Sequence, residues 1–146
     1  MEGRRHNPFF RKILVGYDGS AASERAVDVA ISLAKCTDAE ISVVAVARPP
    51  EPATRVEVDA VIDNAKEHFG EGLRKVRERA VSAQVQLETT IEVGHPAEHL
   101  IHRAEADHAE LIIVGRRGTS LFEKLILGSV SERVLRYAHC PVMVMK

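Results

Sequence analysis

The sequence contains no tryptophan, and aromatic residues make up only 4% of its 146 residues. Proteins that bind single-stranded nucleic acid stack the bases on aromatic side chains, so this composition argues against such a platform. The charge balance points the same way, because 20 basic and 21 acidic side chains give a formal net charge of −1. Nucleic-acid binding depends mainly on neutralising many phosphates with basic side chains. We therefore expect no nucleic-acid partner.

Cysteine is scarce, and long apolar runs are missing. No run approaches the roughly 20 apolar residues that a membrane-spanning helix needs, so no membrane span is expected. The first ten residues are polar and basic and lack the apolar stretch of a signal peptide, so we expect a cytoplasmic protein. In that compartment Cys36 and Cys140, which are far apart in the sequence, are expected to be free thiols.

Short apolar segments alternate with amphipathic ones along the chain. Runs rich in β-branched residues predict strands at 13–17, 41–46, 85–93, 111–114 and 141–145. Apolar residues at helical spacing predict helices at 21–35, 58–81, 96–104 and 129–137. This order predicts one α/β domain over residues 11–146, preceded by a flexible tail of residues 1–10. Its core should be a doubly wound, five-stranded parallel sheet in Rossmann-like or flavodoxin-like order, with helices on both faces.

A glycine pattern follows the strand predicted to be the most deeply buried. Gly115 and Gly118 are three residues apart, and Gly128-Ser129 follows after nine more residues. Glycine lets the backbone turn sharply and approach a ligand closely, and the N–H groups at a helix start favour phosphate. Ser129 is placed either to cap that helix or to donate to a phosphate, and Arg117 to add a charge-assisted contact. From these residues alone, a phosphate site and a plain strand exit with a helix cap both remain open.

Three motifs in this order resemble those of the universal stress protein family. They are the G-x2-G-x9-G-S pattern, the opening ILVGYDGS at 13–20 and the ending HCPVMV at 139–144. The resemblance covers residues 11–146. Because the glycine pattern is complete, the chain resembles the ATP-binding branch of the family, which keeps that pattern. The resemblance implies a homodimeric protein that binds ATP, or ADP or AMP, and acts as a nucleotide-dependent module in the stress response.

The resemblance also implies roles for single residues. Asp18 and Val46, at the ends of the first two strands, would lie at the adenosine, and Val114 and Gly115 would line its adenine and ribose side. Ser20 would lie near the phosphates, but capping the first helix is its favoured role. Whether Mg²⁺ or Mn²⁺ accompanies the phosphates is left open, because no complete set of protein ligands is visible. The phosphate-binding residues implied by the resemblance are Arg117, Gly118, Gly128, Ser129 and Val130.

No catalytic residue is assigned. The chain has no GxxxxGK[S/T] phosphate-binding loop and no GxSxG nucleophile motif, and Gly16 and Gly19 have the wrong spacing for a dinucleotide fingerprint. Rapid phosphoryl transfer needs a metal-holding acid and a positioned base, whereas Asp18 is the one obvious acid at the predicted crevice. We therefore favour a regulatory protein with an unknown protein partner over an enzyme. The alternatives are a slow ATPase or autophosphorylating enzyme, and an interaction protein that holds no nucleotide.

A group of histidines competes as a site. His95, His99 and His102 are spaced so that they could share one helix face, as zinc ligands do. However, Pro96 interrupts the set, and the apolar Leu100 claims the buried face of that helix. The histidines are therefore expected to be mostly solvated, and no metal site is predicted.

The predicted strands at the two sheet edges differ in pattern. Residues 85–93 alternate apolar and polar side chains, which is typical of a half-exposed strand near an edge. The final strand is continuously apolar, and an uncovered apolar edge invites pairing with another strand. We therefore predict a two-fold homodimer in which Val142–Met145 pairs with the same strand of a second copy.

Overall fold

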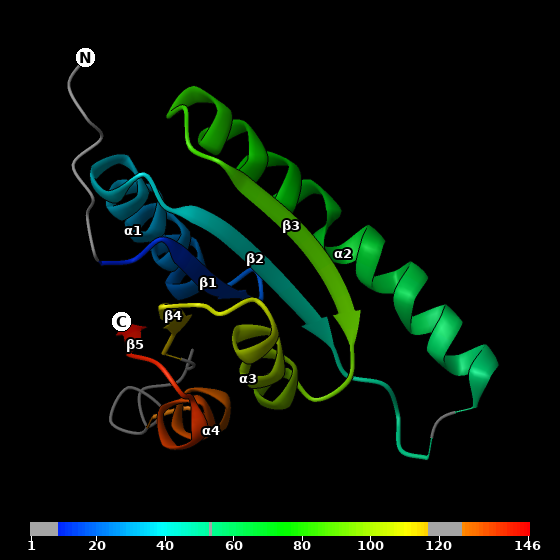
Figure 1. Cartoon of the computed structure of the whole chain (residues 1–146). Coiled ribbons are helices and arrows are strands. Elements are labelled where there is room, and N and C mark those ends of the chain that lie inside the picture. Colours follow the sequence, from blue (N-terminus) through cyan, green and yellow to red (C-terminus); the bar gives the residue numbers. More distant parts are fainter. Residues whose placement is uncertain (1–8, 53, 117–126) are drawn as a thin grey trace.

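Figure 1 shows the computed structural model of the chain, which describes residues 9–52, 54–116 and 127–146. Parallel strands form one sheet in the order β3-β2-β1-β4-β5. The strands are β1 (Lys12–Tyr17), β2 (Glu40–Ala47), β3 (Leu87–Val93), β4 (Leu111–Gly115) and β5 (Val142–Met145). The helices are α1 (Ala21–Thr37), α2 (Arg55–Ser82), α3 (Pro96–Ala106) and α4 (Ser129–Tyr137). The predicted five-stranded parallel sheet is confirmed, and its order is the Rossmann-like one of the two expected.

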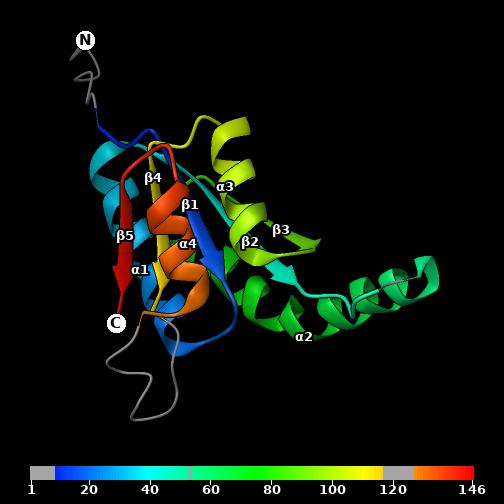
Figure 2. The same ribbon diagram turned by 90° about the horizontal axis from the view of Figure 1, so that it is seen from below.

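The sheet is buried on both faces because its central strands are apolar throughout. Alternate residues of a strand point to opposite faces, so Ile13 and Val15 of β1 belong to one core and Leu14 to the other. The first core is closed by α1 and α2, and the second by α3 and α4, as Figures 1 and 2 show. Phe10 packs against the first core. The rest of the predicted N-terminal tail, apart from Phe9, lies outside the described residues.

The two long helices begin where side chains cap them. The Ser20 hydroxyl accepts a hydrogen bond from the Ser23 amide at 3.1 Å, which confirms the predicted cap of α1. Thr54 and Glu57 form a reciprocal capping box at the start of α2. Helix α2 therefore starts three residues before the predicted boundary at residue 58.

Glycines do not interrupt α2, although Gly70 and Gly72 have the low helix propensity of their residue type. The helix is continuous through both. A Cβ atom at Gly72 would collide with the Tyr17 hydroxyl, whereas one at Gly70 would meet no atom within 4 Å. Gly72 thus allows α2 to pass close over the end of β1, and packing against the sheet outweighs the low helix propensity of glycine.

Other expectations from the sequence also meet the structure. Strand β3 begins at Leu87 and not at Val85, because the Val85 amide donates to the Ala80 carbonyl at the end of α2. Cys36 and Cys140 are both free thiols, and burial raises the pKa of the Cys140 thiol. Within the described ranges, no helix is long and apolar enough to cross a membrane.

Candidate functional site

A pocket of about 570 Å³ opens at the carboxyl ends of β1, β2 and β4. This is the point where the strand order reverses, since β1 pairs with β2 on one side and with β4 on the other. Ligands of doubly wound sheets bind at such switch points, and this volume suits a small organic molecule. Figure 1 shows the N-terminal turns of α2 reaching past the arrowheads of β2 and β3. Residues of this helix from Val61 to Phe69 line one side of the pocket.

The floor and sides of the pocket are mainly apolar. Val44 and Val46 come from β2, Val114 from β4 and Leu100 from α3. Gly16 forms the floor at a position where a Cβ would lie 2.9 Å from the nearest Leu100 methyl carbon. Because any larger residue there would displace Leu100, Gly16 keeps this part of the pocket open. The remaining lining residues are Tyr17, Asp18, Ser23, Ala47, Arg48, Val61, Asn64, Ala65, His68, Phe69, Pro96, Gly115, Val130 and Ser131.

The N-terminus of α1 stands at one side of the pocket and is already capped. The Ser20 amide donates to Asp18 Oδ1 at 2.9 Å, and the Ser23 amide donates to Ser20 Oγ at 3.1 Å. The Ser23 hydroxyl in turn donates to the Ser20 carbonyl at 3.0 Å. Asp18, which lines the pocket, is thereby oriented by the turn that starts α1.

The N-terminus of α4 is different, because no side chain of the described residues caps it. Its N-cap residue is Gly128, so the prediction that Ser129 could cap this helix is wrong: Ser129 is already the first helical residue. Backbone amide groups in such a first turn can donate hydrogen bonds to an anion, and the helix dipole favours negative charge there. One turn in, the Ser131 hydroxyl donates to the Gly115 carbonyl at 3.0 Å and holds the helix start against the exit of β4.

The exit of β4 lies tightly against α1. A Cβ atom on Gly115 would lie 2.9 Å from both the Ala22 Cβ and the Ser23 amide nitrogen. Glycine is therefore required by this close approach, and the requirement is independent of any ligand. The Arg116 amide then donates to the Met145 carbonyl, which continues the pairing between β4 and β5.

The structure brings together most of the described residues that the sequence singled out. Asp18, Val46, Val114, Gly115 and Val130 all line the pocket. Gly128 and Ser129 stand beside it at the start of α4 but are not among the lining residues. Arg117 and Gly118 lie outside the described residues.

Sequence reasoning missed the wall that α2 contributes. Val61, Asn64 and His68 line the pocket together with Arg48 from the segment after β2. The one available signal was their 3–4 residue spacing on a helix that follows a strand end, and this spacing indicates a shared face without indicating what that face meets.

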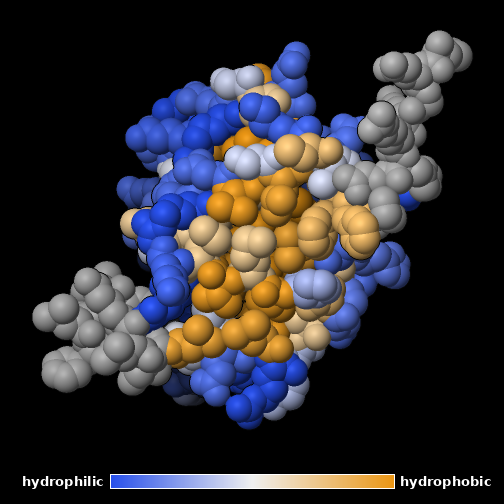
Figure 3. All heavy atoms as spheres, turned by 90° about the vertical axis from the view of Figure 1, so that its left-hand side faces the viewer, coloured by the Kyte–Doolittle hydropathy of each residue, from blue (hydrophilic) through white to orange (hydrophobic). Residues whose placement is uncertain are grey.

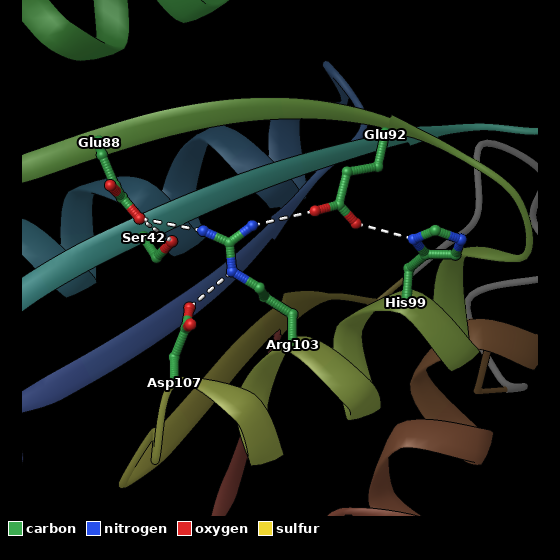
Figure 4. Close-up of polar contacts among 6 residues, drawn as sticks. All are labelled: Ser42, Glu88, Glu92, His99, Arg103 and Asp107. Carbon is green, nitrogen blue, oxygen red and sulfur yellow. Dashed lines mark hydrogen bonds and ion pairs between the residues drawn. The ribbon is translucent and has the colours of Figure 1, made fainter.

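The histidines that were weighed as zinc ligands turn to separate partners. His99 is half-buried, and its Nδ1 lies 2.7 Å from Glu92 Oε2, so the expectation of a solvated side chain is wrong for this residue (Figure 4). His95 Nε2 lies 2.9 Å from Glu51 Oε1, and His102 is exposed. Over the part of the chain that the structure describes, no three His, Cys, Asp or Glu side chains are placed to hold a metal ion.

Comparisons with known proteins agree with the fold and the motifs. The family model described as the universal stress protein family matches residues 9–146. The universal stress protein MJ0531 of Methanocaldococcus jannaschii is 35% identical over 98% of this chain and 86% of its own length. Universal stress protein UspA from Lactobacillus plantarum has a TM-score of 0.84 at 24% identity, over 96% of this chain and 100% of its own. A universal stress protein solved in complex with cAMP has a TM-score of 0.74 at 28% identity, over 94% and 97% of the two chains.

Proposed function

This chain belongs to the universal stress protein family, and from its pocket we propose that it is a regulatory protein that binds an adenine nucleotide, with ATP as the physiological ligand. The observation that carries the proposal is the pocket at the strand switch point. Its apolar walls suit a purine base, and the start of α4 beside it, which no described side chain caps, suits phosphates.

The proposed roles follow the geometry of the pocket. Asp18 and Val46 take the adenosine, and Val114 and Gly115 lie along its adenine and ribose side. The phosphates lie toward α4, where Gly128, Ser129 and Val130 offer backbone amides and one hydroxyl. Arg117 and Gly118 are assigned to the same proposed phosphate site, and the glycine motif of the sequence is the one basis for that assignment.

One relative supports the class of ligand. The universal stress protein solved with cAMP holds an adenine nucleotide on a chain that is 28% identical to this one. That finding concerns the relative. For this chain it favours an adenine nucleotide over other occupants of an apolar pocket, and the complete glycine pattern extends the proposal to ATP with its longer phosphate chain.

The second part of the proposal is a homodimer that forms through β5. Every residue of Val142–Met145 is apolar and half-exposed. Figure 3 shows a broad hydrophobic patch on the side of the molecule that carries this strand. Within the described residues, β5 pairs with β4 alone, so its other edge offers unpaired backbone groups to a second copy.

The experiment is calorimetric titration of the protein with ATP and Mg²⁺, beside the variant Gly128→Val. The backbone at Gly128 has φ −61° and ψ 153°, which valine adopts without strain, so the variant should fold. Its side chain at the start of α4 should weaken ATP binding at least about tenfold by crowding the phosphates. Gly70→Ala is the control, because a Cβ there meets open space away from the pocket.

Two results would overturn the proposal: no binding of ATP at millimolar concentration, or unchanged affinity in Gly128→Val. Native mass spectrometry of the freshly purified protein adds an independent readout, since a tightly held nucleotide survives purification. A turnover assay on the same samples separates a binding protein from a slow ATPase. Steady release of phosphate that is lost in Gly128→Val would establish the enzyme alternative.

A further inference from the structure

The pocket has two chemically different ends. At one end Val130 lines the pocket beside the start of α4, whose first-turn backbone amides are suited to phosphates. The opposite end lies between the exit of β2 and the wall formed by α2. There the polar lining residues are Arg48, Asn64 and His68, none of which belongs to the glycine motif.

Most polar side chains of the pocket are already engaged. Ser131 donates to the Gly115 carbonyl, and Ser23 donates to the Ser20 carbonyl. Asp18 accepts from the Ser20 amide. By contrast, the Asn64 side chain makes no hydrogen bond with any other residue of the described ranges, and it lines the pocket from α2. Its carboxamide therefore has both a donor and an acceptor to offer a ligand.

The position of Asn64 on α2 is set by packing. Ala65 and Phe69 on the same helix are buried in the first core, which orients this part of α2. Asn64 and His68 are four residues apart, so they lie one above the other on the side of the helix that faces the pocket. Val46 of β2 and Val61 of α2 line the same pocket, so the exposed carboxamide of Asn64 lies in a lining that also has apolar side chains.

We propose that Asn64 determines the base specificity of this pocket. An asparagine carboxamide matches the edge of adenine in a bidentate way, because it accepts from the 6-amino group and donates to the neighbouring ring nitrogen. A base without the 6-amino group offers no donor to the Asn64 oxygen, so it makes only one of these two hydrogen bonds. This inference rests on the proposed function and adds to it the residue that selects the base.

The test compares ATP with purine riboside triphosphate, which has the same phosphates and sugar but lacks the 6-amino group. The unmodified protein should bind ATP about tenfold more tightly than the analogue. In Asn64→Ala this preference should fall to near unity, mainly through weaker binding of ATP. Since Asn64 is exposed at the pocket rim, the variant should remain folded, and circular dichroism checks this.

Lys66→Ala is the matched control. Lys66 lies two residues further along α2, is exposed and does not line the pocket, so this variant should keep the preference of the unmodified protein. If the unmodified protein binds ATP and Asn64→Ala keeps the same preference, the specificity inference is wrong while the proposed function stands. If neither protein binds ATP, both are wrong.

Discussion

The strands at the two edges of the sheet, β3 and β5, share one geometry and differ in chemistry. Each pairs with a single strand among the described residues, and so each leaves a row of backbone groups open. Strand β3 places Glu88 and Glu92 on the face toward α3, where Arg103 bridges them. Strand β5 has no charged residue at all. One edge is thus protected by charge, and the other is left suitable for association.

The protection of β3 depends on a network that one guanidinium holds together (Figure 4). Arg103 donates to Glu88 at 3.1 Å, to Glu92 at 3.0 Å and to Asp107 at 2.6 Å. The hydrogen bond to Asp107 is the main cause that raises the pKa of Arg103. Because the guanidinium contacts two positions of β3 and the end of α3, it fixes the edge strand against the helix.

The largest expected effect is the loss of dimerisation when a charged residue, of the kind that β3 carries, is introduced into β5. Val144→Lys should weaken dimerisation at least about a hundredfold, since a lysine in the centre of the pairing strand must be desolvated. Analytical ultracentrifugation over a range of concentrations measures this. Val56→Lys places the same residue at an exposed position of α2 and should leave association unchanged. A Val144→Lys protein that dimerises normally would place the association surface elsewhere.

A smaller effect is expected when the charge network of β3 is broken. Arg103→Leu should lower the free energy of unfolding by about 1–2 kcal/mol, because three carboxylates lose a partly buried partner. Urea denaturation gives the value. Arg74→Leu is the comparison, since its partners Glu71 and Glu78 are exposed and its loss should change stability much less. Equal losses in the two variants would mean that the network protects no more than a surface pair does.

Alkaline pH should lower the stability of the protein through Tyr17 on the central strand β1. It should not change the contrast between the charged edge at β3 and the apolar edge at β5. Burial and a hydrogen bond to Glu24 raise the pKa of the Tyr17 phenol well above its ordinary value near 10. The folded-state pKa is the higher one, so the stabilisation is complete below about pH 10 and is lost as the pH rises further. Tyr17→Phe should lower stability at neutral pH by about 1 kcal/mol and flatten this alkaline decline.

Urea denaturation between pH 8 and pH 11 tests this expectation. In a Tyr137→Phe background the ultraviolet absorbance of phenolate reports Tyr17 alone, since the chain has two tyrosines. Phenolate that forms near pH 10 without loss of structure would contradict the buried, hydrogen-bonded assignment.

The fold was largely predictable because its signals are local. The apolar runs of β1 and β4, the 3–4 residue spacing of α1 and the alternation of β3 each lie within a few residues of sequence. Their order then restricts the topology to a doubly wound sheet. The glycine motif likewise marked the exit of β4, although the collision that a side chain at Gly115 would cause with α1 needs the folded chain.

The rest depended on contacts between distant segments. Gly72 looked like a weak point of α2, and only the position of the Tyr17 hydroxyl explains it. Arg103 meets Glu88 and Glu92 across 15 and 11 residues of sequence, so a helical charge pattern could not reveal the network. Asn64 was overlooked for the same reason, because a polar residue on an amphipathic helix is ordinary until the helix is seen to border a pocket.

One feature joins the pocket to the association edge. Gly115 lines the pocket, accepts from Ser131 and is paired with Met145 of β5, and the next amide continues that pairing. A displacement of Gly115 by a ligand is therefore a displacement of the strand that we propose joins two copies. By thermodynamic reciprocity, a nucleotide that tightens or loosens the dimer must itself be bound with an affinity that changes with protein concentration. The apparent affinity for the nucleotide would then depend on how much of the protein the cell contains.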